Sequence, residues 1–195
     1  MIRLATAHDA KGIARIYAPI VAGTAISFEM VPPTEDEIAG RVASTLVYAP
    51  WLVCARDNEV LGYAYASKHR ERAAYQWSLD VSAYIDGRCR RQGIGRALYT
   101  SLFALLRIQG FYAVHAGITL PNAGSVGLHE ALGFRPVGVY RSVGYKLGAW
   151  HDVGWWQLAI RERADEPPTP LSLADAERRP EWAAALAAGE PLLRP

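Results

Sequence analysis

The stretch "RRQGIGRAL", Arg90–Leu98, decides the fold, because it joins a strand to a helix through two glycines. The residues before it, "WSLDVSAYID" (77–86), predict a strand. Those after it, from Ile94 to Leu106, repeat hydrophobic side chains at helical spacing. At such a corner the unpaired backbone N–H groups and the positive end of the helix dipole point the same way. The sequence therefore predicts a binding site for a phosphate group here.

Strands and helices alternate on both sides of this corner. The capping-box spacing of Thr34 and Glu37 predicts the start of a helix, and the polar pair Asp57–Asn58 predicts a hairpin turn. We expect strands at 1–6, 51–57, 59–69, 75–85, 111–118, 137–144 and 153–160, and helices at 6–21, 31–46, 94–106 and 121–134. This order predicts an α/β fold, with helices on both faces of one sheet.

Composition limits the class of protein. The 195 residues are 51% hydrophobic with a net charge of +2, which suits a domain with one core and argues against a protein that coats nucleic acid. Cys54 and Cys89 lack the paired spacing of a zinc site, so we expect reduced thiols and no metal. Without an apolar leader or membrane-spanning run, we expect a cytoplasmic protein with no membrane partner.

The composition changes near residue 162. We interpret 1–161 as one domain and 162–195 as a proline-rich tail that packs on its surface or is partly loose. One short helix is expected at 181–188.

Three phosphate-binding patterns compete for the glycine corner. A P-loop needs lysine and then serine or threonine after its last glycine, where Arg96–Ala97 stands, and a dinucleotide fingerprint needs a third glycine near Leu98. The third pattern, Arg/Gln-x-x-Gly-x-Gly, is met by Arg90, Gly93 and Gly95. It resembles the acetyl-CoA site of the GNAT N-acetyltransferase superfamily. The alternative is a surface loop with glycine caps and solvated arginines.

Two longer motifs favour the GNAT interpretation. "PNAGSVGLHEALGF" (121–134) resembles the second cofactor segment of the superfamily. "GYKLGAWHDVGWWQL" (144–158), with "AAYQWSLDVSAYI" (73–85), resembles the phosphinothricin and methionine sulfoximine N-acetyltransferase branch. This resemblance covers residues 1–161. It implies the GNAT fold, with a mixed, mostly antiparallel sheet, acetyl-CoA as co-substrate and a small-molecule amine as acceptor.

The resemblance also implies which residues bind the cofactor. Backbone N–H groups of the corner would wrap the pyrophosphate, with glycines allowing close approach. The preceding strand would bulge and offer amides to the acetyl and pantetheine groups, and an asparagine would contact the pantetheine arm. By position the expected cofactor residues are Ala83, Tyr84, Ile85, Arg91, Gln92, Gly93, Ile94, Gly95, Arg96 and Asn122.

Two residues are candidates for proton transfer. Asp80 shares a strand face with Ser82 and Tyr84 and is the expected base, acting directly or through water, although related enzymes often carry Glu there. The alternative is an ordinary polar residue on a wet strand face. His129 stands where many GNAT enzymes place a tyrosine that protonates the thiolate. It is either that acid or a hydrogen-bonded helix histidine.

The basic stretch Lys68–Arg72 suits an anionic amino-acid analogue. The resemblance implies substrate contacts from Phe28, Arg72 and Tyr75, and Trp150, Trp155 and Trp156 would serve the core, the pocket or a homodimer interface. We expect acetylation of the α-amine of phosphinothricin or methionine sulfoximine. The alternatives are an enzyme for another amine (an aminoglycoside, a polyamine or a protein N-terminus) and a non-catalytic acyl-CoA sensor.

Overall fold

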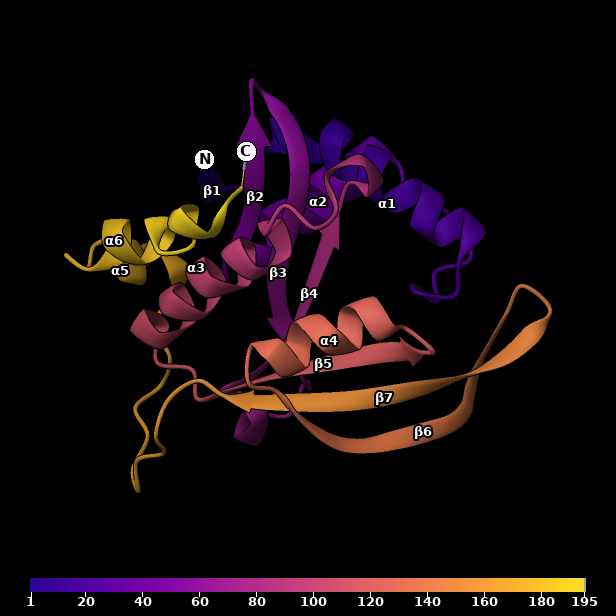
Figure 1. Cartoon of the computed structure of the whole chain (residues 1–195). Coiled ribbons are helices and arrows are strands. Elements are labelled where there is room, and N and C mark those ends of the chain that lie inside the picture. The colour runs from indigo at the N-terminus through magenta and orange to yellow at the C-terminus, as the bar shows by residue number, and fades with distance from the viewer. Residues whose placement is uncertain (195) are drawn as a thin grey trace.

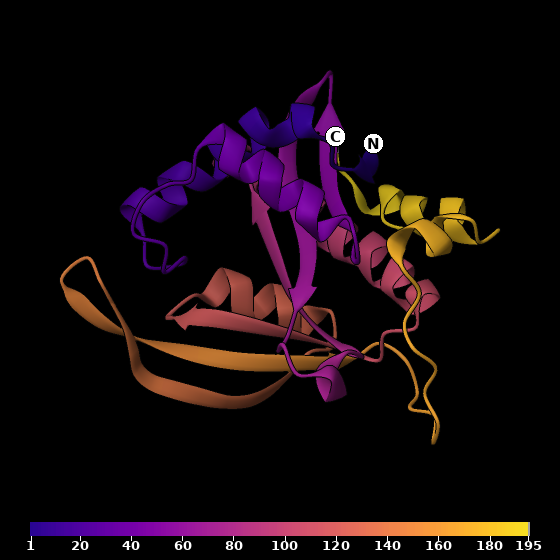
Figure 2. The same cartoon turned by 180° about the vertical axis from the view of Figure 1, so that it is seen from behind.

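The centre of the computed structural model, which describes residues 1–194, is one seven-stranded sheet (Figures 1 and 2). Its strand order is β1-β2-β3-β4-β5-β7-β6, and every neighbouring pair is antiparallel except β4 and β5. The mixed, mostly antiparallel sheet is thus confirmed. The strands are β1 (Ile2–Leu4), β2 (Trp51–Arg56), β3 (Glu59–Lys68), β4 (Ser78–Ile85), β5 (Ala113–Leu120), β6 (Arg135–Lys146) and β7 (Ala149–Ala159).

Helices cover both faces of this sheet, as expected. Alternate side chains of β2 enter two different cores: Trp51 and Val53 pack on the side of α1 and α2, and Leu52 and Cys54 on the side of α3. The α-helices are α1 (Ala10–Gly23), α2 (Glu35–Thr45), α3 (Ile94–Gln109), α4 (Ala123–Ala131), α5 (Leu173–Glu177) and α6 (Trp182–Ala187).

Local sequence signals agree with the structure at several element ends. Thr34 caps α2 and forms the full capping box with Glu37. Asp57 and Asn58 have φ angles of 49° and 64°, as a tight hairpin turn between β2 and β3 requires. Two strand starts are wrong by three residues or more: β4 begins at Ser78 and not at Tyr75, because residues 73–75 form a 3₁₀ turn, and β7 begins at Ala149 and not at Val153.

The sheet divides between its two parallel strands. β4 and β5 pair only at Ser78–Ala113, Leu79–Val114 and Asp80–His115, after which they diverge. In Figure 1, β1–β4 run almost vertically while β5, β7 and β6 run almost horizontally. The fork therefore opens directly after Asp80 and His115.

The C-terminal tail packs along α3, beside which α6 is seen in Figure 1. Leu173, Ala176 and Trp182 are buried in the same core as α3. The expected helix at 181–188 is present as α6, whereas α5 and a 3₁₀ turn at Glu190–Leu192 were not expected. Among the described residues, none of the helices has the length and apolar character needed to cross a bilayer.

Candidate active site

The glycine corner has the backbone of an anion-binding turn. Arg91 and Gly93 adopt left-handed φ angles of 65° and 79°, and α3 begins at the next residue, Ile94. The first helical hydrogen bond runs from the Ala97 N–H to the Gly93 carbonyl. The N–H groups of residues 94–96 therefore have no carbonyl acceptor within the helix and remain available to an anion.

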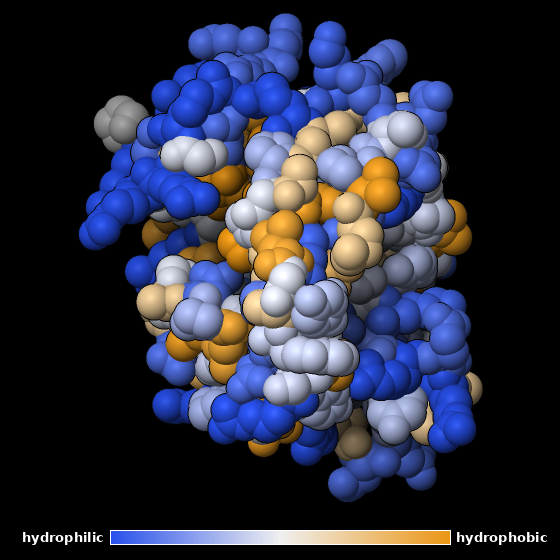
Figure 3. Space-filling view, turned by 90° about the vertical axis from the view of Figure 1, so that its right-hand side faces the viewer, coloured by the Kyte–Doolittle hydropathy of each residue, from blue (hydrophilic) through white to orange (hydrophobic). Residues whose placement is uncertain are grey.

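A cavity of about 640 Å³ lies at this corner. Figure 3 views the side toward which β4 and β5 open, where hydrophobic residues gather near the middle and hydrophilic ones surround them. The cavity is lined by nearly all the expected cofactor residues, namely Ala83, Tyr84, Ile85, Arg91, Gly93, Ile94, Gly95, Arg96 and Asn122, together with His129. Gln92 is not in the lining; its carbonyl accepts a hydrogen bond from the Arg194 N–H at 3.0 Å.

The cavity has a positively charged border. Arg90, Arg91 and Arg96 all line it with exposed side chains, and none forms an ion pair within residues 1–194. Their charge is thus available to the phosphate groups of a nucleotide. By contrast, Arg88 is bound to Asp86 and Glu59 and holds the pKa of the Asp86 carboxyl far below its usual range.

The expected bulge in β4 is absent. β4 pairs with β3 in unbroken register from Leu79 to Ile85. The Asp86 N–H donates to the Leu61 carbonyl of β3. Because successive N–H groups of a strand point to opposite sides, those of Ala83 and Ile85 point away from β3, into the gap between β4 and β5. Divergence of the two strands, rather than a bulge, frees these donors.

The glycines of the corner meet protein neighbours. A Cβ atom at Gly93 would lie 2.3 Å from the Leu192 carbonyl oxygen, and one at Gly95 would lie 3.1 Å from Leu128 Cδ2. Gly93 is thus required by its left-handed φ and by the tail, and Gly95 by packing on α4. Close approach to a ligand, the expected reason for both glycines, is not needed to explain them.

Asn122 caps α4, with its side-chain oxygen accepting a hydrogen bond from the Ser125 N–H at 3.1 Å. The remaining amide N–H₂ group is a donor at the cavity wall.

Asp80 lies at the fork and is bound to a residue that was not singled out from the sequence. Its Oδ1 is 2.6 Å from Nδ1 of His69, and the two side chains are 28% and 14% exposed. Burial raises the pKa of the Asp80 carboxyl above its ordinary value, and the hydrogen bond from His69 offsets part of that rise. An ionised Asp80 only accepts hydrogen bonds, so Nδ1 of His69 then carries the hydrogen.

Both ring nitrogens of His129 have partners inside the protein. Nδ1 lies 2.8 Å from the Ser125 carbonyl oxygen and Nε2 lies 3.1 Å from the Tyr99 hydroxyl. Since the carbonyl can only accept, Nδ1–H donates to it and Nε2 accepts from Tyr99. Burial lowers the pKa of His129, and the hydrogen bond to Ser125 opposes this. This geometry favours the second alternative, a hydrogen-bonded helix histidine.

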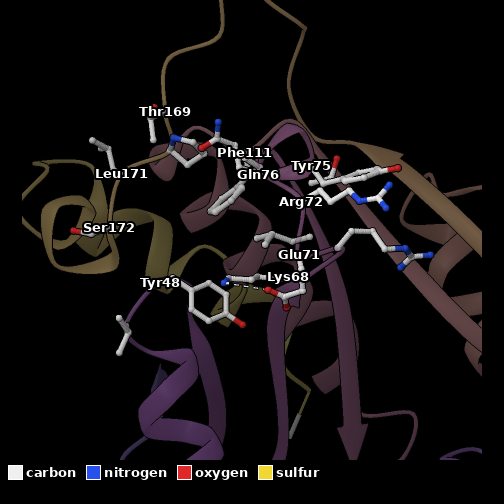
Figure 4. A pocket seen from close by; sticks show the side chains of 16 residues that line it. Tyr48, Lys68, Glu71, Arg72, Tyr75, Gln76, Phe111, Thr169, Leu171 and Ser172 are labelled. Atoms are coloured by element: carbon white, nitrogen blue, oxygen red, sulfur yellow. Dashed lines mark ion pairs between the residues drawn. The ribbon is translucent and has the colours of Figure 1, made fainter.

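The three expected substrate residues do not meet in one cavity. Arg72 and Tyr75 line a separate cavity of about 410 Å³, where Figure 4 shows them opposite Leu171 and Ser172 of the tail. Lys68 is 3.8 Å from Glu71, which offsets its charge. Arg70 and Arg72 also line this cavity, and neither has an ion pair within the described part of the chain.

Phe28 does not line the cavity of Arg72 and Tyr75 and instead packs against β6. A Cβ atom on Gly144 of β6 would be only 2.1 Å from its ring, so the ring rests directly on this strand. Nearby, the buried Lys146 donates to the Val21 and Ser27 carbonyls at 2.6 and 2.7 Å. These contacts join the β6–β7 hairpin to the end of α1 and close that side of the fork.

His69 and His115 are the candidate site residues that sequence reasoning missed. They are 46 residues apart, and only the β3–β4 hairpin and the β4–β5 register bring both to Asp80. His69 immediately follows the basic residue Lys68 in "SKHRERAAY", and that position was the only local signal.

Comparisons with known proteins agree with this geometry. Residues 2–155 match the acetyltransferase (GNAT) domain family. Phosphinothricin N-acetyltransferase of Streptomyces viridochromogenes is 39% identical over 170 residues, which are 87% of this chain and 92% of that protein. The L-methionine sulfoximine/L-methionine sulfone acetyltransferase of Salmonella typhimurium is 32% identical, over 84% of this chain and 96% of that protein. A phosphinothricin acetyltransferase of Sinorhizobium meliloti, crystallised with acetyl-CoA, has a TM-score of 0.81 and 34% identity, over 87% of this chain and 92% of that one.

The family match and the named relatives identify an enzyme that takes an acetyl group from acetyl-CoA, and the forked sheet, the free helix N-terminus at its opening and the border of unpaired arginines suit that cofactor. The chain belongs to the GNAT acetyltransferase family. It is an acetyl-CoA-dependent N-acetyltransferase, with acetyl-CoA as its co-substrate.

Proposed function

We propose that this enzyme acetylates the α-amine of a small amino-acid analogue, with phosphinothricin and methionine sulfoximine as the first candidates. The observation that carries the proposal is a half-buried carboxylate, Asp80, at the residue where β4 and β5 separate. It lies three residues before the part of β4 that lines the cofactor cavity. Relatives named for these two activities, at 39% and 32% identity, support the choice of acceptor.

In this proposal the corner holds the pyrophosphate, with the N–H groups of residues 94–96 and the three unpaired arginines as donors. Asn122 donates to the pantetheine arm. The N–H groups of Ala83 and Ile85 bind the acetyl and pantetheine groups and bring the thioester to the fork. Gln92 supports the turn through its bond to the tail.

Acetyl transfer needs a neutral amine, because an ammonium group has no lone pair for attack on the thioester carbon. We assign proton removal to the fork, where Asp80 supplies a negative charge close to the acceptor. His129 keeps the shape of the cavity through its bonds to Ser125 and Tyr99. Its alternative role, protonation of the leaving thiolate, is tested by His129→Phe, which should then lower kcat more than cofactor affinity.

Arg72, Tyr75 and Phe28 are proposed to select the acceptor. A substrate with a carboxylate and a second anionic or strongly polar head would benefit from the unpaired guanidinium of Arg72. Aminoglycosides and polyamines would meet like charge there. This disfavours the other-amine alternative, and the Asp80–His69 pair disfavours a non-catalytic sensor.

The test is a thiol-release assay with acetyl-CoA and four acceptors: phosphinothricin, methionine sulfoximine, kanamycin and spermidine. We expect turnover with the first two. Turnover with spermidine or kanamycin alone would overturn the acceptor assignment. Binding of acetyl-CoA without turnover of any amine would support the sensor.

We further propose a homodimer in the cytoplasm. Large apolar side chains are exposed along β6 and the adjacent turn, among them Val137, Val143, Tyr145 and Leu147, at 50–63% exposure. A second copy would cover this surface. Cys54 and Cys89 are both free thiols, which favours a reducing compartment. Sedimentation equilibrium of the wild type and of Val143→Lys tests the dimer.

A further inference from the structure

The fork holds a cluster of three titratable side chains, His69, Asp80 and His115. One oxygen or ring nitrogen from each lies within 4.8 Å of those of the other two. His69 directly follows β3, while Asp80 and His115 are the last residues that β4 and β5 pair. The cluster thus lies where the acceptor amine must meet the thioester, if the proposed path of the cofactor along β4 is correct.

The hydrogen bond between Asp80 and His69 determines which nitrogen of His69 is free. With Nδ1–H donated to the ionised carboxylate, the lone pair of the neutral imidazole resides on Nε2. Nε2 has no hydrogen-bond partner among residues 1–194, and this atom is not fully buried. It is therefore open to a substrate or to water. A carboxylate bound to Nδ1–H also stabilises the imidazolium that forms when Nε2 gains a proton.

The groups around His69 are consistent with this role. Arg70 lies over the Trp155 ring, with its guanidinium carbon 5.8 Å from the centroid, and its NH1 donates to the His69 carbonyl. Tyr75 and Trp155 meet the His69 ring edge-on at 6.0 and 6.1 Å. His115 stacks on it at 4.2 Å, and burial lowers the pKa of His115, so this neighbour adds no positive charge at neutral pH.

A metal site is the competing interpretation of the same three residues. Ligand nitrogens bind a metal through lone pairs in the ring plane, so two histidines must aim their rings at one point. The rings of His69 and His115 are instead stacked with only 17° between their planes. In addition, Nδ1 of His69 is already bound to Asp80. The arrangement suits a hydrogen-bonded pair better than a coordinated ion.

We propose that Nε2 of His69 is the atom that takes the proton from the substrate ammonium and that Asp80 positions and charges this imidazole. This inference rests on the proposed function and deepens it by naming the accepting atom. The N–H bond of the ammonium breaks as Nε2–H forms, which leaves a neutral amine and an imidazolium paired with Asp80. The amine lone pair then attacks the thioester carbon. The C–S bond breaks as the N–C bond forms, and coenzyme A leaves as a thiolate that takes up the second proton lost by the acetylated nitrogen. The imidazolium releases its own proton to water.

The kinetic test compares His69→Gln with His115→Phe, using acetyl-CoA and phosphinothricin. Gln keeps a donor for Asp80 but has no basic nitrogen, whereas His115→Phe keeps a stacked ring next to an intact His69–Asp80 pair. We expect His69→Gln to lower kcat by about 10²–10⁴-fold with little change in the KM of acetyl-CoA. It should also remove the acid limb of the kcat/KM profile, which His115→Phe should retain.

A rescue experiment separates lost chemistry from lost structure. In His69→Ala, added imidazole should restore part of kcat, because a free base can occupy the vacated space. Thermal unfolding shows whether each variant folds. If His69→Gln keeps the wild-type rate and pH profile while Asp80→Asn is impaired, our inference is overturned and the proposed function stands. If the wild type turns over neither phosphinothricin nor methionine sulfoximine, the proposed function fails instead.

Nitrogen NMR of the histidine-labelled wild type tests the pair without any substrate. The spectrum contains five histidines, and His69→Gln identifies the signal of His69. When the ring is neutral, we expect its hydrogen on Nδ1. The opposite tautomer, or loss of activity on chelation that zinc restores, would overturn the inference.

Discussion

Two opposing effects act on the pKa of the Asp80 carboxyl. Burial raises this pKa, and the hydrogen bond from His69 lowers it. In our proposal the Asp80–His69 pair works at neutral pH only while the carboxylate is ionised and accepts the hydrogen of Nδ1. The informative substitution is therefore one that removes the charge of Asp80.

We predict that Asp80→Asn lowers kcat by about 10²–10⁴-fold at pH 7, the usual range for loss of general-base catalysis. The defect should shrink at high pH, because the acceptor amine is then already neutral. Initial rates of thiol release between pH 6 and pH 10 measure both effects. A defect of constant size across this range would contradict a role in deprotonation.

The side chains of His115 and His129 should make the stability of the fold depend on pH. Burial lowers the pKa of both, so near and below about pH 6.5 the unfolded chain binds protons that the folded chain does not. Their contribution to stability is present in full above that pH and is lost as the pH falls. Between pH 7.5 and 5.5 we expect the free energy of unfolding to decrease, and His115→Phe to reduce this decrease.

Urea unfolding at several pH values measures this slope. His8→Gln, which changes an exposed histidine, is the matched control and should leave it unaltered. An equal slope in His115→Phe and the wild type would show that His115 is not held neutral by burial.

At the scale of elements, the tail is a support for the glycine corner. The Gly189 N–H donates to Ser101 Oγ of α3 at 3.0 Å, and the Arg194 N–H donates to the Gln92 carbonyl of the corner. Contacts of the tail thus reach from the helix to the turn that precedes it, so we propose that the tail stabilises the cofactor site.

Gly189→Ala tests this support. Its Cβ would lie 1.9 Å from the Ala97 carbonyl oxygen, so this part of the tail must move away from α3. We expect a loss of about 1–3 kcal/mol in the free energy of unfolding, as for other overpacked sites, and weaker acetyl-CoA binding in calorimetry.

Gly40→Ala is the matched control, because a Cβ on this exposed residue of α2 has no neighbour within 4 Å. It should preserve or slightly raise stability, since alanine favours a helix. Wild-type stability and binding in Gly189→Ala would contradict a supporting role for the tail.

For the whole molecule, the separation of its cavities bears on substrate choice. The corner and β4 line one cavity, while Arg72 and Tyr75 line another next to the tail. His69 lies between these parts of the chain, with its ring 6.0 Å from Tyr75 and its Nδ1 bound to Asp80. We propose that the acceptor enters from the side of Arg72 and Tyr75, opposite the nucleotide.

We predict that phosphinothricin or methionine sulfoximine exceeds kanamycin and spermidine by at least about tenfold in kcat/KM, or about 1.4 kcal/mol. Arg72→Ala should raise the KM of the amino-acid analogue more than that of acetyl-CoA, because a charge-assisted contact is lost. The KM of Arg72→Lys for the analogue should lie between those of the wild type and Arg72→Ala, since lysine keeps the charge but not the planar guanidinium group. Unaltered kinetics in Arg72→Ala would contradict the entry path.

The sequence by itself determined the features that depend on neighbours along the chain. The order of strands and helices, the Thr34 capping box, the Asp57–Asn58 turn and the glycine corner each follow from spacing within a few residues. Motif resemblance added the family and ten expected cofactor residues, nine of which line one cavity.

Only the tertiary structure decided how distant segments meet. The unbroken β3–β4 register replaced the expected bulge, and the short β4–β5 pairing opened the fork after Asp80. The same registers brought His69 and His115 to that carboxylate, while packing on α3 brought the tail to the corner. Strand register and helix packing depend on the complementary fit of side chains far apart in sequence, and no local spacing encodes that fit.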